Sequence, residues 1–287
     1  DCAGAVGRGG GGGGSDFGSG RVTMRYLVFG DVHANLVALD AVLAAADRHR
    51  VDAFLCVGDL VGYGPEPLEC LERLLPLQRD ERLALVAGNH DVVARGDHTP
   101  DGFGPEAVET LRWTIEVVRA QQWAVKFLAS GQPVVKVAGG IWLTHDSLSA
   151  PGSGYYHRAT QNAARELDAL AQRGGRIAFY GHTHAMRAEV QTGAAVMLTP
   201  MNACDAMGRD PEPVRLAEGE RAWIGTGSVG FPTKTKGAAE FLILNDADWT
   251  VEKYTVGFSR EQAKARTRAV FGSVCRPETV ERIVRWL

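Results

Sequence analysis

The sequence predicts an α/β protein made of two sheets with flanking helices. Up to residue 129, short apolar runs alternate with amphipathic stretches, which indicates β-α-β units and a largely parallel sheet. Beyond residue 130, most apolar runs follow one another at short spacing, as antiparallel strands do. With 287 residues, 45% of them hydrophobic, the chain can bury one sizeable core.

The first part of the chain predicts strand, helix, strand, helix, strand. The strands are RYLVFG (25–30), VDAFLCVGD (51–59) and RLALVAGNHD (82–91). The helices between them are NLVALDAVLAAADRH (35–49), with leucines near helical spacing, and PEPLECLERLL (65–75). Two further helices are predicted at 105–119 and 121–129.

The second part begins with PVVKVAGGIWLTHD (133–146), in which Gly139 and Gly140 between two apolar runs predict a hairpin. A helix at 160–173 and a strand with its loop in RIAFYGHTHAM (176–186) follow. Antiparallel strands are expected near 186–199, 221–226, 239–245 and 249–256, and two helices close the chain.

Residues 1–23 differ in composition from the rest of the chain. They include six consecutive glycines and few apolar side chains, so burial cannot offset their chain entropy. We expect a flexible Gly-rich linker or an appended segment at 1–23, with Met24 as the native start. Residues 24–287 show no internal repeat and are expected to form a single domain.

Charge and cysteine content exclude several classes of protein. The formal net charge is −3 with acids and bases interleaved, so there is no strong nucleic-acid signature. No apolar run approaches the roughly 18 residues of a membrane span, and no signal-like segment opens the chain, so a cytoplasmic location is expected. The five cysteines form no C-x-x-C pair, which argues against a zinc ribbon or a disulfide framework. Oligomeric state is left open.

Polar side chains that can bind metals fall at the ends of the apolar runs. They are Asp31, His33, Asp59, Asn89, His90, His145, His182 and His184. In open α/β sheets, residues beyond the carboxyl ends of strands converge on one crevice. Oxygen and nitrogen donors without a thiolate make a poor structural zinc site but suit two divalent cations such as Mn²⁺, Fe²⁺ or Zn²⁺.

Each of these residues also has an ordinary explanation. Asp31 or Asp59 alone would more often be a turn or capping residue, and a lone His145 would usually be a hydrogen-bonded structural histidine. The pair His182 and His184 is more specific, because two residues apart on an extended segment their rings project to one side. The joint occurrence of all these residues at the ends of apolar runs favours the metal site over the ordinary explanations.

Five ordered segments resemble the motif blocks of the calcineurin-like metallophosphoesterases. They are GDVHAN, GDLVGYG, GNHD, THD and GHTH, all between residues 30 and 184. GTGSVGFP (225–232) is also similar to a late Gly-Ser-Val-Gly segment of the bacterial predicted-phosphoesterase branch. The resemblance implies a four-layer α-β-β-α sandwich of two mixed sheets flanked by helices.

The resemblance also implies a role for each residue. One metal ion would be held by Asp31, His33 and His184, the other by Asn89, His145 and His182, and Asp59 would bridge both. Two divalent ions, with Mn²⁺ favoured over Fe²⁺ or Zn²⁺, would generate a bridging hydroxide that attacks a phosphoester in line. His90 would donate a hydrogen bond or proton to the phosphoryl or leaving-group oxygen, and Asp91 would orient the His90 ring and keep it protonated. His157, in the loop after His145, is a candidate for a substrate contact.

Departures from the family pattern bear on the substrate. The Asp-Arg-Gly and Arg-Gly-Asn-His-Glu motifs of protein phosphatases are missing, so a phosphodiester or nucleotide-like substrate is favoured over a phosphoprotein. Asp146 stands where many relatives have glycine, and Gly225-Thr226 where they often have Asn-Pro. A phosphomonoesterase with the same site and a non-catalytic protein-binding scaffold are the alternatives. A Rossmann enzyme is disfavoured because no G-x-G-x-x-G follows the first strand.

Overall fold

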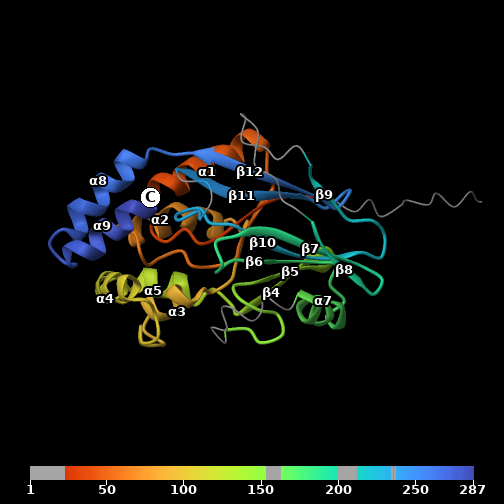
Figure 1. The fold of residues 1–287 in the computed structure, drawn as a ribbon, viewed down its shortest axis with the longest axis horizontal. Coiled ribbons are helices and arrows are strands. Elements are labelled where there is room, and N and C mark those ends of the chain that lie inside the picture. Colours follow the sequence, from red (N-terminus) through yellow and green to blue (C-terminus); the bar gives the residue numbers. More distant parts are fainter. Residues whose placement is uncertain (1–22, 153–162, 200–211, 234, 236) are drawn as a thin grey trace, which may run out of the picture.

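The computed structural model describes residues 23–152, 163–199, 212–233, 235 and 237–287. Almost all of the predicted linker or appended segment, and the candidate His157, therefore lie outside the described residues. Two six-stranded mixed sheets lie one above the other, and helices cover their outer faces (Figure 1). The predicted α/β class and the four-layer arrangement are confirmed. Among the described helices, none is both long and apolar enough to cross a membrane.

The first sheet has the order β3-β2-β1-β11-β12-β9. Its parallel half follows the predicted β-α-β-α-β order through β1 (Arg25–Phe29), α1 (Leu36–His49), β2 (Ala53–Cys56), α2 (Pro67–Arg79) and β3 (Leu83–Leu85). The antiparallel half contains β9 (Val214–Arg215), β11 (Ala238–Asn245) and β12 (Thr250–Gly257). The two-residue strand β9 was not predicted from the sequence.

The second sheet has the order β4-β5-β6-β10-β7-β8. Its strands are β4 (Val134–Val137), β5 (Ile141–Thr144), β6 (Ile177–Tyr180), β7 (Met186–Thr192), β8 (Ala195–Thr199) and β10 (Arg221–Thr226). The predicted hairpin joins β4 to β5 through a short 3₁₀ turn, where Gly139 and Gly140 take φ angles of 74° and 91°. Strand β10 runs antiparallel to β7 but parallel to β6, so the prediction of antiparallel pairing was only partly right for this strand.

Six further helices are described outside the β-α-β units of the first sheet. They are α3 (Asn89–Ala94), α4 (Pro105–Arg119), α5 (Gln122–Ala129), α7 (Ala163–Gln172), α8 (Arg260–Phe271) and α9 (Pro277–Trp286). The short helix α3 differs from the expectation, because Gly-Asn-His-Asp resembles only the end of a strand in the sequence. The Asp91 carboxylate accepts a hydrogen bond from the Gly88 backbone N–H at 3.1 Å, which is the contact that starts this helix.

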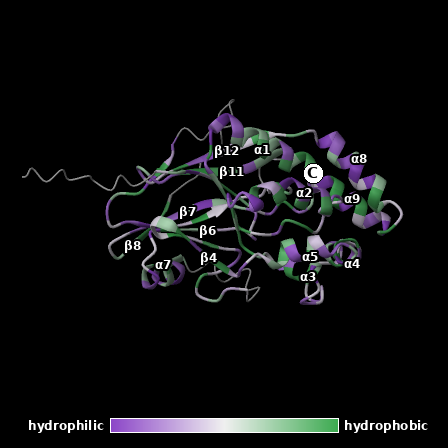
Figure 2. Ribbon diagram, turned by 180° about the vertical axis from the view of Figure 1, so that it is seen from behind, coloured by the Kyte–Doolittle hydropathy of each residue, from purple (hydrophilic) through white to green (hydrophobic). Residues whose placement is uncertain are grey.

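Alternating side chains along the strands explain the four layers. Leu27 and Phe29 of β1 pack in the cluster beneath α1 and α2, whereas Val28 packs in the cluster between the two sheets. In β6, Phe179 faces the first sheet and Tyr180 packs in the cluster with α7. The helices carry hydrophobic and hydrophilic bands in Figure 2, since each buries one face only.

Candidate metal centre

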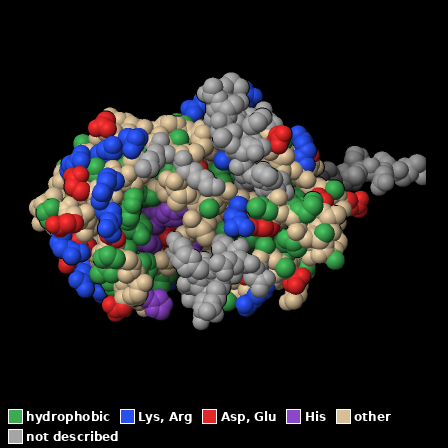
Figure 3. Space-filling model, viewed as in Figure 1, with side chains coloured by type: hydrophobic (Ala, Val, Ile, Leu, Met, Phe, Trp, Pro, Cys, Tyr) green, Lys and Arg blue, Asp and Glu red, His purple; other side chains and the backbone are tan. Residues whose placement is uncertain are grey.

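Loops at the carboxyl ends of five strands bring the predicted ligands together between the two sheets. Asp31 and His33 follow β1, Asp59 follows β2, Asn89 begins α3 after β3, His145 follows β5, and His182 and His184 follow β6. Asp31 joins the sheets directly, because its two carboxylate oxygens accept from the His182 backbone N–H at 2.9 and 3.1 Å. Histidine side chains are visible at the base of a hollow in the surface (Figure 3).

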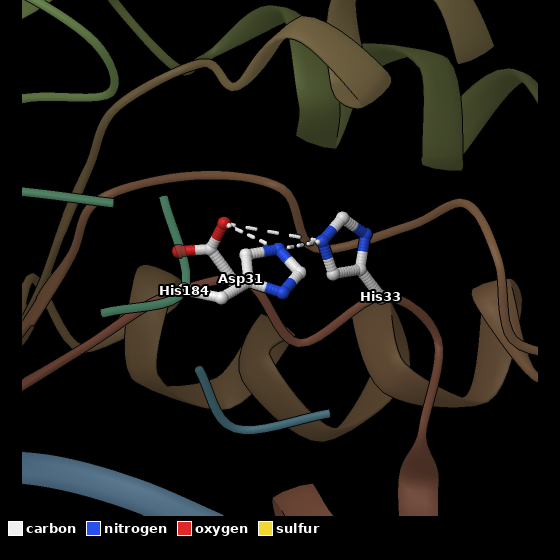
Figure 4. A group of neighbouring side chains, drawn as sticks. All are labelled: Asp31, His33 and His184. Atoms are coloured by element: carbon white, nitrogen blue, oxygen red, sulfur yellow. Dashed lines mark hydrogen bonds and ion pairs between the residues drawn. The ribbon is translucent and has the colours of Figure 1, made fainter. Parts of the chain in front are cut away.

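Asp31, His33 and His184 form the first group (Figure 4). His184 Nε2 lies 3.2 Å from Asp31 Oδ1 and 2.9 Å from His33 Nε2. His33 Nε2 lies 3.9 Å from Asp31 Oδ1. Three donor atoms thus point at one small volume, which is the arrangement predicted for one metal ion.

His145, His182 and Asn89 form the second group. His145 Nε2 lies 2.9 Å from Asn89 Oδ1 and 3.1 Å from His182 Nδ1. Asp59 lies between the groups, with Oδ2 3.2 Å from His145 Nε2 and 3.8 Å from His33 Nε2. The structure therefore brings all seven predicted ligands into two adjacent groups, with Asp59 within reach of both.

Backbone carbonyls fix the orientation of three of the imidazoles. His33, His145 and His184 each place Nδ1 at a carbonyl oxygen, so assigning the proton to Nδ1 leaves the Nε2 lone pair directed into the site. The carbonyls belong to Val61, Val57 and Phe231, at 3.4, 2.7 and 2.9 Å respectively. Lone pairs of His33 and His184 that meet at 2.9 Å repel unless a proton or a cation lies between them. Imidazole, carboxylate and amide donors in this arrangement fit divalent transition-metal ions.

The protein groups alone already show strong electrostatic coupling. Burial works against a charged His145, but the neighbouring Asp59 carboxylate outweighs it and raises the pKa of His145 to about 10. The pKa of His184 is raised in the same way, with burial opposing and Asp31 favouring the proton. Burial, with the positive charge of His145 adding to it, lowers the pKa of His182 to about 2. Positive charge is thus favoured beside each carboxylate, where a cation would also be stabilised.

The ligand loops are held in a strained backbone conformation. Five of the seven predicted ligands have φ in the left-handed region: Asp31 (50°), His33 (49°), Asp59 (53°), His182 (65°) and His184 (52°). Such residues cost roughly 1–3 kcal/mol each and cluster at functional sites. Gly88 permits the close approach of two loops, because a Cβ there would collide with Asp59 Oδ1.

His90 lies beside the two groups, and its surroundings correct one expectation. Asp91 does not orient the His90 ring; its carboxylate accepts from the backbone N–H groups of Leu60, Val61 and Gly88 at 2.8, 3.2 and 3.1 Å. Burial lowers the pKa of His90 to about 4 despite the pull of Asp59, so the ring is neutral rather than protonated as we expected. The short helix explains the difference, since Asp91 caps the N-terminus of α3 and braces the loop that carries Asp59.

Aromatic rings, which the motif analysis missed, enclose His90. Tyr63 lies 4.8 Å from the His90 ring and 4.9 Å from the His33 ring, centroid to centroid, and Phe103 packs edge-on against His90 at 5.0 Å. Burial raises the pKa of the Tyr63 phenol to about 12. Tyr63 lies between Gly62 and Gly64 in the segment GDLVGYG, and this place within a motif was the only signal available in the sequence; the structure gives it a φ of 57°.

Two other supports lie far from the ligands in sequence. Ser228, in the Gly-Ser-Val-Gly segment, donates from Oγ to the Asp31 carbonyl at 2.9 Å. Glu166 of α7 is buried and accepts four hydrogen bonds from the loop after His145, given by Ser147 Oγ, Leu148 N, Ser149 N and Ser149 Oγ at 2.9, 2.7, 3.1 and 2.6 Å. Nothing in the local sequence around Glu166 identified it as a support for the site.

Two cavities open beside the centre. One of about 650 Å³ lies on the side of Asn89, His145 and His182, and its lining includes Asp146. The Asp146 carboxylate is turned into its own loop, where Oδ1 accepts from the backbone N–H groups of Ser147 and Gly152 at 2.7 and 3.1 Å. The other cavity, of about 380 Å³, lies on the side of His184.

Comparison with known proteins gives consistent matches. The family model described as calcineurin-like phosphoesterase matches residues 24–186. A metallophosphoesterase of known crystal structure from Sphaerobacter thermophilus is 28% identical, with 92% of this chain and 100% of that chain covered and a TM-score of 0.70. An uncharacterized protein from Methanocaldococcus jannaschii is 27% identical over 245 residues, or 84% of this chain and 91% of its own length. A hypothetical protein from Pyrococcus horikoshii shares the fold at 15% identity, with a TM-score of 0.67 over 90% of this chain and 97% of its own.

Proposed function

Since the chain belongs to the calcineurin-like phosphoesterase family, we propose that it is a hydrolase of phosphodiesters, including nucleotide-like ones, that uses two divalent metal ions. The observation that carries the proposal is the convergence of seven nitrogen and oxygen donors in two groups that share Asp59. Asp31, His33 and His184 would hold one ion and Asn89, His145 and His182 the other. Mn²⁺ is the first candidate, with Fe²⁺ and Zn²⁺ as alternatives.

The chain's own groups orient the imidazoles and enclose His90. Two bound cations would neutralise the phosphoryl oxygens and lower the pKa of a nucleophilic water. The carbonyls of Val57, Val61 and Phe231 hold the imidazoles in place, so the ligands need little reorganisation on binding. His90, neutral and enclosed by Tyr63 and Phe103, would donate one N–H hydrogen bond to a phosphoryl or leaving-group oxygen.

The test is hydrolysis of bis(p-nitrophenyl) phosphate by protein that is stripped of metal and reloaded with Mn²⁺. Asp59→Ala should lose nearly all of the rate, because both ions lose a ligand, and His90→Ala should lose roughly 100-fold in kcat. Matched controls are Asp40→Ala and His49→Ala on α1, where Asp40 pairs with Arg73 at the surface and His49 packs on Tyr254. Equal rates in all five proteins would refute the proposal.

Comparison of bis(p-nitrophenyl) phosphate with p-nitrophenyl phosphate decides between diesterase and monoesterase activity. A higher kcat/KM for the diester is expected. Full metal content without hydrolysis of either compound would favour a non-catalytic scaffold instead.

A further inference from the structure

The smaller cavity beside His184 is walled by three aromatic side chains. Tyr63, Phe231 and Trp286 line it together with Thr183, His184, Pro232 and Thr233. We propose that this aromatic pocket binds a planar ring attached to the phosphoester substrate, a nucleobase or an aryl group. The inference deepens the proposed function and rests on it for the place of the phosphoester.

Tyr63 links the aromatic pocket to the metal centre. Its ring packs against His33 and His90, at centroid distances of 4.9 and 4.8 Å. The other neighbours of the ring are Phe231 and Trp286, each at 5.6 Å, with the Trp286 ring at 90° to it. A phosphoester bound at the metal centre would therefore lie next to the pocket, which His184 also lines.

The three rings are held by separate parts of the fold. Tyr63 is in the loop after β2 and has a φ of 57°. Phe231 is in the loop after β10, and the carbonyl oxygen of Phe231 also orients the His184 ring. Trp286 is in the last turn of α9, and the chain end beside it is anchored by a hydrogen bond from Arg260 Nε to the Leu287 carbonyl oxygen. Helix α9 packs its apolar face with Phe231 in one cluster, which fixes the position of Trp286 relative to the site.

The exposure and chemistry of the lining favour a neutral flat ligand. Trp286 keeps 37% of its surface exposed, although it is a large apolar side chain that folding would otherwise bury. Among the described lining residues of this pocket there is no Lys, Arg, Asp or Glu, whereas the larger cavity is lined by Arg95, Asp97, Asp101 and Asp146. A volume of about 380 Å³ lies within the usual range of roughly 300–1,000 Å³ for small-molecule sites. Nucleobases stack on aromatic side chains and need no charged side chain to do so.

Equilibrium binding separates the ring from the phosphate. Isothermal titration calorimetry on the Mn²⁺-loaded full chain would compare AMP with ribose 5-phosphate, which lacks only the base, and with phenyl phosphate. In the wild type we expect AMP to bind roughly tenfold more tightly than ribose 5-phosphate, since stacking of a base on an aromatic side chain is typically worth roughly 5- to 150-fold in affinity. If phenyl phosphate exceeds ribose 5-phosphate in affinity by the same factor as AMP does, the ring is recognised by stacking alone. If that factor is smaller for phenyl phosphate than for AMP, the edge of the base also contributes.

Trp286→Ala should weaken AMP binding roughly tenfold and change ribose 5-phosphate binding by less than about twofold, while Trp286→Phe should retain most of the preference. Trp123→Ala is the matched control, because Trp123 is a partly buried tryptophan of α5 that packs on the core beneath the first sheet. Equal affinities of the wild type for AMP and ribose 5-phosphate would overturn the inference, as would equal losses for both ligands in Trp286→Ala.

The result is distinguishable from failure of the proposed function. Base-dependent binding that disappears in Trp286→Ala supports the aromatic pocket even if no phosphoester is hydrolysed. Hydrolysis of bis(p-nitrophenyl) phosphate without any base preference would overturn the aromatic pocket and leave the hydrolase proposal standing.

Discussion

At the scale of single residues, buried charge is balanced within the site itself. Asp31 and Asp59 are almost completely buried, and the partners described for them are imidazoles and backbone N–H groups. A buried carboxylate is costly unless it is paired, and a positive charge shared among histidines supplies that pairing. Protons and metal ions therefore compete for the same place.

This competition predicts a pH dependence of metal binding. Because Asp59 raises the pKa of His145 to about 10, His145 carries a proton at pH 7 that a cation at Nε2 must displace. We expect Mn²⁺ or Zn²⁺ binding near pH 7 to release about one proton or more, and the affinity to fall as the pH falls. Calorimetry in buffers of different ionisation enthalpy measures the released protons. Affinity that does not change between pH 6 and pH 9 would contradict this account.

A substitution at the glycine beside His90 is predicted to lower the rate of catalysis without loss of bound metal. Gly62 has a φ of 88°, and a Cβ there would collide with His90 Nδ1. Gly62→Ala should push the ring away and lower kcat by roughly 10- to 100-fold, since a displacement of about 1 Å can cost that much. Gly193→Ala is the control, because Gly193 has a φ of 60° in the β7–β8 turn but a Cβ added there would meet no atom within 4 Å. An unchanged kcat in Gly62→Ala would show that the position of the His90 ring is not critical.

At the scale of elements, the sequence predicted the strands and helices with a clear period and missed the shortest ones. The helix at Pro105–Arg119 was predicted at its full length, because its apolar positions repeat with a helical period. Helix α3 and strand β9 have six and two residues, too few for any period to be detected. The region 186–199, expected to be strand, contains two antiparallel strands joined by a turn at Gly193.

Helix α7 is predicted to stabilise the loop that carries His145. Glu166 accepts four hydrogen bonds from residues 147–149, so Glu166→Ala leaves buried donors without partners. The free energy of unfolding should fall by about 2–3 kcal/mol, and Mn²⁺ affinity should weaken because His145 is less firmly placed. Urea unfolding and metal titration measure the two effects. Asp168→Ala, an exposed acidic residue on the same helix, should change neither, and a similar loss there would refute the specific role of Glu166.

At the scale of the whole molecule, the convergence of the predicted ligands could be inferred from the sequence and their surroundings could not. Asp31, Asp59 and Asn89 follow strands whose parallel order is visible in the sequence, so their convergence could be inferred from topology. Tyr63, Phe231 and Trp286 meet only because α9 folds back against the loop after β10. No local pattern encodes a contact between a loop near residue 63 and the last turn of the chain, and a single sequence gives no covariation to reveal it.

The same topology predicts that metal ions stabilise the entire fold. The predicted ligands follow β1, β2 and β3 in one sheet and β5 and β6 in the other, so ions bound between them would connect the two halves of the core. A ligand that binds only the native state at 100 times its Kd adds about 2.7 kcal/mol, which for a chain of this size corresponds to a rise in Tm of roughly 4–5 °C. Differential scanning calorimetry with Mn²⁺ and with excess EDTA measures that rise. Asp59→Ala, which removes the carboxylate near both groups, should lose most of the shift, whereas Asp40→Ala should keep it. A full shift in Asp59→Ala would mean that the ions stabilise the protein at a different site.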